Sequence, residues 1–161
     1  MAKTAVINAS PLIFLSRGQH LELLQLVAET LLVPEPVAVE IRARGHLDPT
    51  VKALDRTPWL RCVPGVPTPP IVTVWGLGAG ESAVLALAEA NPGMEAIIDD
   101  LAGRRCAALL GIPVRGTLGI VLTAKQRGVI PAARPVLECL IQSGLYLSRR
   151  ILDTGLQRVG E

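Results

Sequence analysis

The sequence predicts an α/β protein built on a central, mostly parallel sheet of four to five short strands. Short apolar runs alternate with segments of helical periodicity, as βαβ units require. Half of the residues are hydrophobic and 19% are charged, a balance typical of a packed domain. The chain has 161 residues, the size of one ordinary domain, and we expect a single domain over residues 1–161.

Several apolar segments have the length of short buried strands. They occur at residues 5–7, 31–33, 59–63, 96–98 and 112–114. The β-branched run "IVTVW" at residues 71–75 also predicts a strand. Because parallel sheets bind ligands at the carboxyl ends of their strands, the polar residues that follow these runs are the first place to look for a site.

Segments with apolar residues three and four positions apart connect the strands and predict helices. Pro36 suits a first helical turn, Gly111 is expected to end a helix, and Ser148 to cap one. A break is expected near Gly18, and four prolines make residues 64–70 a loop. The predicted helical segments are residues 12–29, 34–44, 48–56, 76–90, 101–111, 117–127, 133–143 and 149–158.

Charge is unevenly distributed along the chain. Residues 1–99 contain seven Lys and Arg against ten Asp and Glu, whereas residues 100–161 contain nine against four. This asymmetry is consistent with a cation-binding site beside an anion-binding rim, and equally with solvated helix faces. The chain has two Trp, one Tyr and one Phe, too few for a surface on which many bases stack.

The cysteines and the hydropathy pattern bear on location. The three cysteines share no metal-ligand spacing and indicate a reducing compartment. No apolar run approaches the length of a membrane span. Polar residues interrupt the apolar run nearest the N-terminus, which argues against a signal peptide. We therefore expect a cytoplasmic protein without a membrane partner.

Polar residues stand at or near the ends of the predicted elements, and each has an ordinary structural explanation. Turns, helix caps or solvated surface positions would account for any one of them. They are Asn8, Ser10, Glu40, Glu81, Asp99 and Asp100. Together they would gather carboxylates at one sheet edge, where only a cation would offset their repulsion. Oxygen ligands without His or Cys favour Mg²⁺ or Mn²⁺, ions that assist phosphodiester hydrolysis.

Other chemistries have less support. In "GLGAGE", Glu81 occupies the position of the third glycine of a dinucleotide-binding loop, where a carboxylate would repel a pyrophosphate. No phosphate-binding P-loop motif occurs. His20 and His46 stand near no convincing nucleophile, so a catalytic triad is unsupported.

Six motifs follow one another along nearly the whole chain: "VINASPLIFLS", "LLVPEPVAVEI", "GLGAGESAVLALA", "AIIDDLAGRR", "GIPVRGTLGIVLTAKQRGVI" and "RVGE". In this order they resemble a prokaryotic subfamily of PIN-domain proteins related to the VapC toxins. The resemblance implies an α/β/α sandwich and a ribonuclease site of clustered acids that holds Mg²⁺ or Mn²⁺.

The resemblance also assigns positions in that site. Asn8 stands at the first acid position of the family, Glu40 at the second and Glu81 at the third. Asp100 is favoured for the fourth, with Asp99 adjacent. All five are expected metal ligands, and Asn8, Glu40, Glu81 and Asp100 are the expected catalytic residues.

Three further residues are expected to contact the substrate. Ser10 matches a small hydroxyl residue of the family, and Arg104 a basic position after the paired acids. Ser10 and Thr117 would position water or phosphate, and Arg104 would contact the RNA backbone. Thr117 in "GTLG" is equally suited to be the N-cap of the helix that it opens.

Asn8 departs from the family pattern, because most active PIN nucleases have Asp there. An amide oxygen binds Mg²⁺ without contributing a full charge, so the affinity should be lower. The predicted function is a metal-dependent endoribonuclease, the toxin-like member of a toxin–antitoxin pair. The alternative is a catalytically weak or inactive module that binds RNA or a protein.

The expected partners are RNA, a cognate antitoxin and a second copy of the chain, since VapC-like proteins usually form dimers. Apolar residues that follow residue 116 either complete the core or contribute to a homodimer contact. They are Leu118, Ile120, Val121, Leu137, Leu140 and Ile141.

Overall fold

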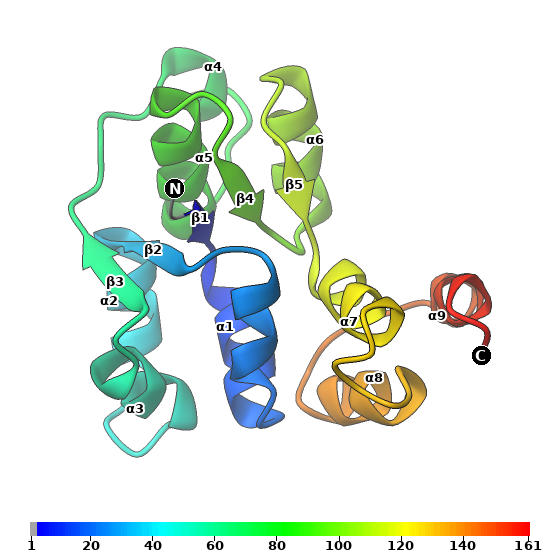
Figure 1. Cartoon of the computed structure of the whole chain (residues 1–161). Coiled ribbons are helices and arrows are strands. Elements are labelled where there is room, and N and C mark those ends of the chain that lie inside the picture. Colours follow the sequence, from blue (N-terminus) through cyan, green and yellow to red (C-terminus); the bar gives the residue numbers. More distant parts are fainter. Residues whose placement is uncertain (1–2) are drawn as a thin grey trace.

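The computed structural model describes residues 3–161, and its elements follow the predicted alternation of strands and helices (Figure 1). The strands are β1 (Thr4–Ile7), β2 (Thr30–Pro34), β3 (Leu60–Val63), β4 (Glu95–Ile97) and β5 (Val114–Arg115). The helical elements are α1 (Ala9–Arg17), the 3₁₀ helix η1 (Leu21–Leu26), α2 (Glu35–Arg42), α3 (Pro49–Arg56), α4 (Pro70–Thr73), α5 (Ala79–Ala90), α6 (Leu101–Leu109), α7 (Thr117–Gln126), α8 (Arg134–Gln142) and α9 (Arg149–Arg158).

Within residues 3–161 the five strands form one parallel sheet in the order β3-β2-β1-β4-β5. β1 is central: its Val6 pairs with Leu32 of β2 and with Ala96 of β4. The chain builds the sheet outward from β1 to β3 and then returns to the other side of β1 for β4 and β5. The direction of the strand order therefore reverses between β1 and β4, the place where such sheets bind ligands.

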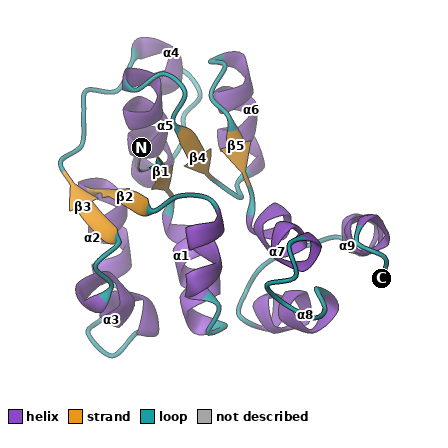
Figure 2. Cartoon of the chain, in the orientation of Figure 1, coloured by secondary structure: helices purple, strands orange, loops and turns teal. Residues whose placement is uncertain are grey.

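Helices flank the sheet (Figure 2). Among the described helices, α5 has the most buried residues. Residues 83–88 of α5 are buried where the helix packs against β1, β2 and β4. α2 packs in turn on α5. This packing fixes the first turn of α5 and the exposed face of α2 near the carboxyl end of β1. The predicted α/β fold class is confirmed.

The predicted strand at residues 71–75 is wrong, because this segment contains the short helix α4. Pro70 stands in its first turn, where the fixed backbone of proline favours a helix and the missing N–H costs nothing. The Thr73 hydroxyl donates a hydrogen bond to the Pro69 carbonyl oxygen at 3.3 Å. Val72 is buried in the core, whereas Ile71 is 51% and Val74 84% exposed, so only one of the β-branched side chains is enclosed as a strand of this sheet would require.

The C-terminal helices α7, α8 and α9 group beside the sheet, with α9 outermost (Figure 1). Of the six apolar residues expected either to complete the core or to form a dimer contact, four are buried in the core. They are Ile120, Val121, Leu137 and Leu140. Leu118 is partly buried, and Ile141 is 36% exposed. Across residues 3–161 no helix combines the length and the apolar character that crossing a membrane requires.

Glu161 connects the end of α9 to the start of α8. Its carboxylate accepts hydrogen bonds from the backbone N–H groups of Ala133, at 2.6 Å, and Arg134, at 3.0 Å. Nζ of Lys125, in α7, lies 3.8 Å from Oε2 of Glu161. The two backbone hydrogen bonds lower the pKa of Glu161, with smaller help from the nearby cations. The carboxylate thus stabilises the start of α8 and holds α9 in place.

We expect Glu161→Ala to lower the melting temperature at neutral pH. Since the folded-state pKa of Glu161 is lowered, its stabilisation is complete above the pKa of an unfolded glutamate and is lost as the pH falls through the folded-state value. The melting temperatures of the variant and the wild type should therefore converge in acid. Glu138→Ala, at an exposed position of α8, is the control and should follow the wild type. Equal melting temperatures of Glu161→Ala and wild type at pH 7 would contradict this role.

Candidate functional site

Asn8 follows β1 and occupies the N-cap position of α1, but among the described residues its side chain makes no capping hydrogen bond. The side chain points instead to α5, where its Nδ2 donates to Oε1 of Glu81 at 3.4 Å. Asn8 is 2% exposed, and within residues 3–161 its Oδ1 has no hydrogen-bond partner. A buried acceptor without a partner costs about 1–3 kcal/mol, so this oxygen favours a ligand.

Glu40 of α2 joins Asn8 around Gly80, in the first turn of α5. A Cβ atom added at Gly80 would lie 2.9 Å from Oε2 of Glu40 and 3.2 Å from Oδ1 of Asn8. The absence of a side chain at Gly80 therefore leaves room for both oxygens. Glu40 is an exposed residue of α2, but partial desolvation of its carboxyl group, and then the charge of Glu81, raise its pKa.

Glu81 lies between this group and the end of β4. A Cβ at Gly103 of α6 would lie 3.5 Å from Oδ2 of Asp100 and 3.9 Å from Cγ of Glu81. Asp100 is the N-cap of α6, and its Oδ2 accepts the Gly103 N–H at 2.8 Å. Glu81 stands in the first turn of α5, where the helix dipole favours a carboxylate. The structure thus brings Asn8, Glu40 and Glu81 together and places Asp100 beside Glu81.

Asp99 points away from Asp100, toward the start of α7. It accepts hydrogen bonds from the Thr117 backbone N–H at 2.7 Å and from the Thr117 hydroxyl at 2.6 Å. Burial raises the pKa of Asp99, and the two hydrogen bonds and the charge of Arg104 oppose this rise. A Cβ at Gly116 would lie 3.1 Å from Oδ1 of Asp99 and 2.6 Å from Nη1 of Arg104, so this glycine leaves room for both groups.

The predicted substrate residues lie around the same sheet edge. Thr117 is fully buried, and the N-cap position of α7 belongs to Gly116 rather than to Thr117. Its hydroxyl therefore binds Asp99 and does not cap the helix. Ser10 lies in the first turn of α1 and is partly buried, and Arg104 is exposed on α6.

The donor atoms at this edge fit a hard divalent cation. Between residues 3 and 161 no three His, Cys, Asp or Glu side chains form a cluster that could hold a metal ion. What the fold assembles is a pair of carboxylates, Glu40 and Glu81, completed by the amide oxygen of Asn8. Oxygen donors of this kind, one of them buried and unpaired, suit Mg²⁺ or Mn²⁺ rather than softer metals.

Comparison with protein families agrees with the fold. The sequence model of a family described as a PIN domain matches residues 4–161. The chain belongs to the PIN-domain family. PIN domains are in general nucleases that depend on divalent metal ions. No curated protein matches the chain. The finer resemblance to the VapC-like subfamily stays a prediction.

Two features of this PIN domain are missed by reasoning from sequence. The first is that Gly80 and Gly116 each make room for a pair of polar side chains. The only sequence feature that could have pointed to these glycines is that each precedes an expected site residue, Glu81 or Thr117. The second feature is the pairing of Asp99 with Thr117, which are 18 positions apart. No sequence pattern links a polar residue at the end of one strand to a hydroxyl residue at the start of a later helix.

Proposed function

We propose that this protein is a metal-dependent endoribonuclease of the PIN type. The observation that carries the proposal is the convergence of Asn8, Glu40 and Glu81, from three separate elements, around a glycine without a side chain. Membership of the PIN-domain family points to nuclease activity in general. RNA as the substrate and the requirement for Mg²⁺ or Mn²⁺ are parts of this proposal.

The residues divide into groups with different tasks. Asn8, Glu40 and Glu81 would hold the cation, with Asp100 and Asp99 as the acids nearest to them. A bound cation of this kind lowers the pKa of a water molecule and stabilises negative charge on a phosphate oxygen. The chain's own side chains would orient the phosphodiester around that centre.

Arg104 is placed to do part of this orienting, because its guanidinium lies beside Asp99 at the edge of the acid group. An arginine binds phosphate oxygens through two parallel N–H donors, which fixes the phosphate in orientation as well as in position. Thr117 holds Asp99 by two hydrogen bonds, and Ser10 is proposed to position water or phosphate.

A second candidate function is an RNA-binding or protein-binding module without turnover. It is favoured by the amide at position 8, because Nδ2 of Asn8 donates a hydrogen bond to Glu81 without any cation between the two side chains. For the nuclease we propose a cytoplasmic protein that works as the toxin-like member of a toxin–antitoxin pair and forms a homodimer. A small reading frame beside its gene, encoding an antitoxin-like protein, would support that role.

Titration of Mn²⁺ into the purified protein tests the metal-dependent function. We expect saturable binding below millimolar concentration, and we expect cleavage of RNA that EDTA stops and Mn²⁺ restores. If no saturable binding occurs below millimolar metal, the nuclease proposal fails and the binding-module alternative gains support.

A substitution at Gly80 tests the geometry of the site. We expect Gly80→Ala to reduce RNA cleavage about tenfold, because its Cβ would displace the oxygens of Glu40 and Asn8, and small misplacements of reacting groups are costly. The variant should not show the gain in stability of up to about 1 kcal/mol that alanine in place of glycine brings in a helix, because the Cβ displaces the buried Asn8. Thermal unfolding and an RNA cleavage assay measure the two effects.

Gly119→Ala is the matched control for this substitution. Gly119 also lies in a helix, α7, and no heavy atom of the described residues lies near its Cβ position. It should show this gain in stability and keep full cleavage. Equal cleavage by the two alanine variants would show that the oxygens around Gly80 are not in the reactive geometry.

A further inference from the structure

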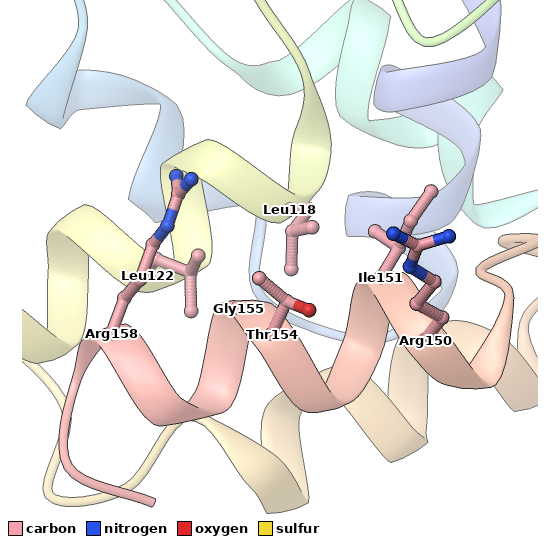
Figure 3. A pocket seen from close by; sticks show the side chains of 7 residues that line it. All are labelled: Leu118, Leu122, Arg150, Ile151, Thr154, Gly155 and Arg158. Carbon is pink, nitrogen blue, oxygen red and sulfur yellow. The ribbon is translucent and has the colours of Figure 1, made fainter.

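Two hollows adjoin on the outer side of α7. The first, of about 550 Å³, begins at Asp99 and Arg104 and continues along Leu118 and Tyr146 to Ile151. The second, of about 340 Å³, lies between α7 and α9 and is lined at its ends by Arg150 and Arg158 (Figure 3). Because Leu118 and Ile151 line both hollows, they form one groove that leads away from the acid residues. We call it the α7–α9 groove.

The groove is positively charged along its length. Arg104, Arg150 and Arg158 line it and are exposed, and none of the three makes an ion pair with another described residue of the chain. Arg150, Thr154 and Arg158 follow one another at helical spacing on α9, and Figure 3 shows the two arginines at opposite ends of this row. They stand eight residues apart, which corresponds to about 12 Å along a helix.

The wall nearest to the acid residues carries an exposed aromatic ring. Tyr146 is 86% exposed although it lines the first hollow. Leu101 of α6, at 61% exposure, stands in the same lining. An exposed ring beside unpaired arginines is the combination by which proteins hold single-stranded nucleic acids, with bases stacked on the ring and phosphates on the cations.

The close approach of α9 to α7 gives the groove its floor. A Cβ at Gly155 would lie 3.2 Å from Cδ1 of Leu122 and 3.4 Å from Cδ1 of Leu118. A glycine inside a helix lowers helix stability, so its presence here is explained by this close packing. Glu161 holds the C-terminal end of α9 on α8, so the helix that carries Arg150 and Arg158 is fixed in position.

We infer that the α7–α9 groove binds single-stranded RNA on one side of the acid site, with phosphates on Arg150 and Arg158 and an unpaired base on Tyr146. The inference rests on the proposed function for the identity of the polyanion. Charge complementarity favours RNA over a protein segment, since Asp99, at the end nearest to the site, is the one acid that lines either hollow among the described residues.

Binding can be measured apart from cleavage by fluorescence anisotropy in EDTA, with the full chain and a fluorescein-labelled single-stranded RNA of about 12 nucleotides. The double variant Arg150→Gln/Arg158→Gln should bind about tenfold more weakly. It should also reduce the slope of log K against log salt concentration by about 1.4, because each phosphate contact on a single strand contributes about 0.7. A merely structural role of the arginines would not change this slope.

Two further variants complete the test. Tyr146→Ala should weaken binding about tenfold through the loss of one stacked base, with an unchanged salt slope. Arg149→Gln is the matched control, because Arg149 is exposed on the same helix but lines neither hollow. It should retain most of the affinity.

The outcomes separate this inference from the proposed nuclease function. Loss of binding in the groove variants supports the inference even if the protein never binds Mn²⁺ or cleaves RNA. The inference is overturned if the arginine and tyrosine variants bind and cleave RNA as the wild type does. In that case the nuclease proposal still stands. The inference is also overturned if the wild type binds no RNA, or if the arginine variants convert a dimer to a monomer in solution without a change in RNA affinity.

Discussion

Glu81→Gln is expected to reduce RNA cleavage about 100-fold or more while the fold remains intact. Glu81 lies between the Asn8 side of the site and the Asp100 side. Its Oε1 accepts from Asn8, and its Cγ lies near the Gly103 position that Asp100 also borders. Glutamine has the same shape and keeps an oxygen that can accept from Asn8, so the substitution removes little except the charge. Charge stabilisation by a cation is worth several kcal/mol, and each 1.36 kcal/mol is a factor of ten in rate.

The same substitution should change Glu40 in a measurable way. The charge of Glu81 is one cause of the raised pKa of Glu40, the larger cause being burial. With glutamine at position 81 the pKa of Glu40 should fall toward its ordinary range, which NMR titration of the side-chain carboxyl carbon can follow. Mn²⁺ affinity, measured by calorimetry, should decrease in parallel with cleavage.

Glu89→Gln is the control for this experiment. Glu89 lies near the other end of α5, is exposed, and loses the same charge. It should cleave RNA as the wild type does. If Glu81→Gln retains the cleavage rate of this control, the nuclease activity comes from a contaminant, and the acid site has another role.

The fold could be predicted from sequence because local signals and burial agree in most of the chain. "AVI" at residues 5–7 and the apolar residues 83–88 of α5 are both buried, so the hydrophobic pattern of each segment agrees with its position in the core. The segment 71–75 shows where this agreement fails. Its β-branched residues favour a strand, but two preceding prolines start a helical turn, and the side chains remain largely outside the core.

The site could be predicted in part, since strand ends of a parallel sheet lie at one edge and this rule placed Asn8, Asp99 and Asp100 there. The rule could not show which of the two aspartates lies nearer to Glu81. That depends on side-chain direction: Asp100 turns toward Gly103, and Asp99 toward Thr117. Nor could it show that Glu40 and Asn8 both border Gly80, because this depends on how α2 packs against α5 and on the missing side chain of Gly80.

Asn8→Asp should have opposite effects on the protein without metal and on the protein with metal. In the wild type the amide N–H of Asn8 approaches Glu81 without repulsion, because a donor faces an acceptor. Aspartate has no such donor and would add a third carboxylate beside Glu40 and Glu81. We expect the free energy of unfolding in EDTA at pH 7 to fall by about 1–3 kcal/mol, the usual cost of a buried group left without its partner.

With Mn²⁺ the same carboxylate becomes favourable, since the charge of the ligand set is a main determinant of affinity for hard cations. We expect Mn²⁺ to bind about tenfold more tightly than in the wild type. The rise in melting temperature on adding Mn²⁺ should be correspondingly larger, because a ligand that binds only the folded state stabilises it according to its affinity. RNA cleavage should increase with occupancy of the site. Differential scanning fluorimetry with and without Mn²⁺ measures both effects in one experiment.

Asn8→Ala distinguishes the added charge from the loss of the amide. Alanine removes the hydrogen bond to Glu81 but adds no carboxylate, so it should not gain Mn²⁺ affinity. If Asn8→Asp and Asn8→Ala respond alike to Mn²⁺, the oxygen at position 8 does not face the cation, and the unpaired Oδ1 has a structural explanation. If only the aspartate variant gains affinity and cleavage, the site is a metal site whose strength the wild-type amide limits. Opposite signs in EDTA and in Mn²⁺ are decisive, because a residue that only supports the fold would change both stabilities in the same direction.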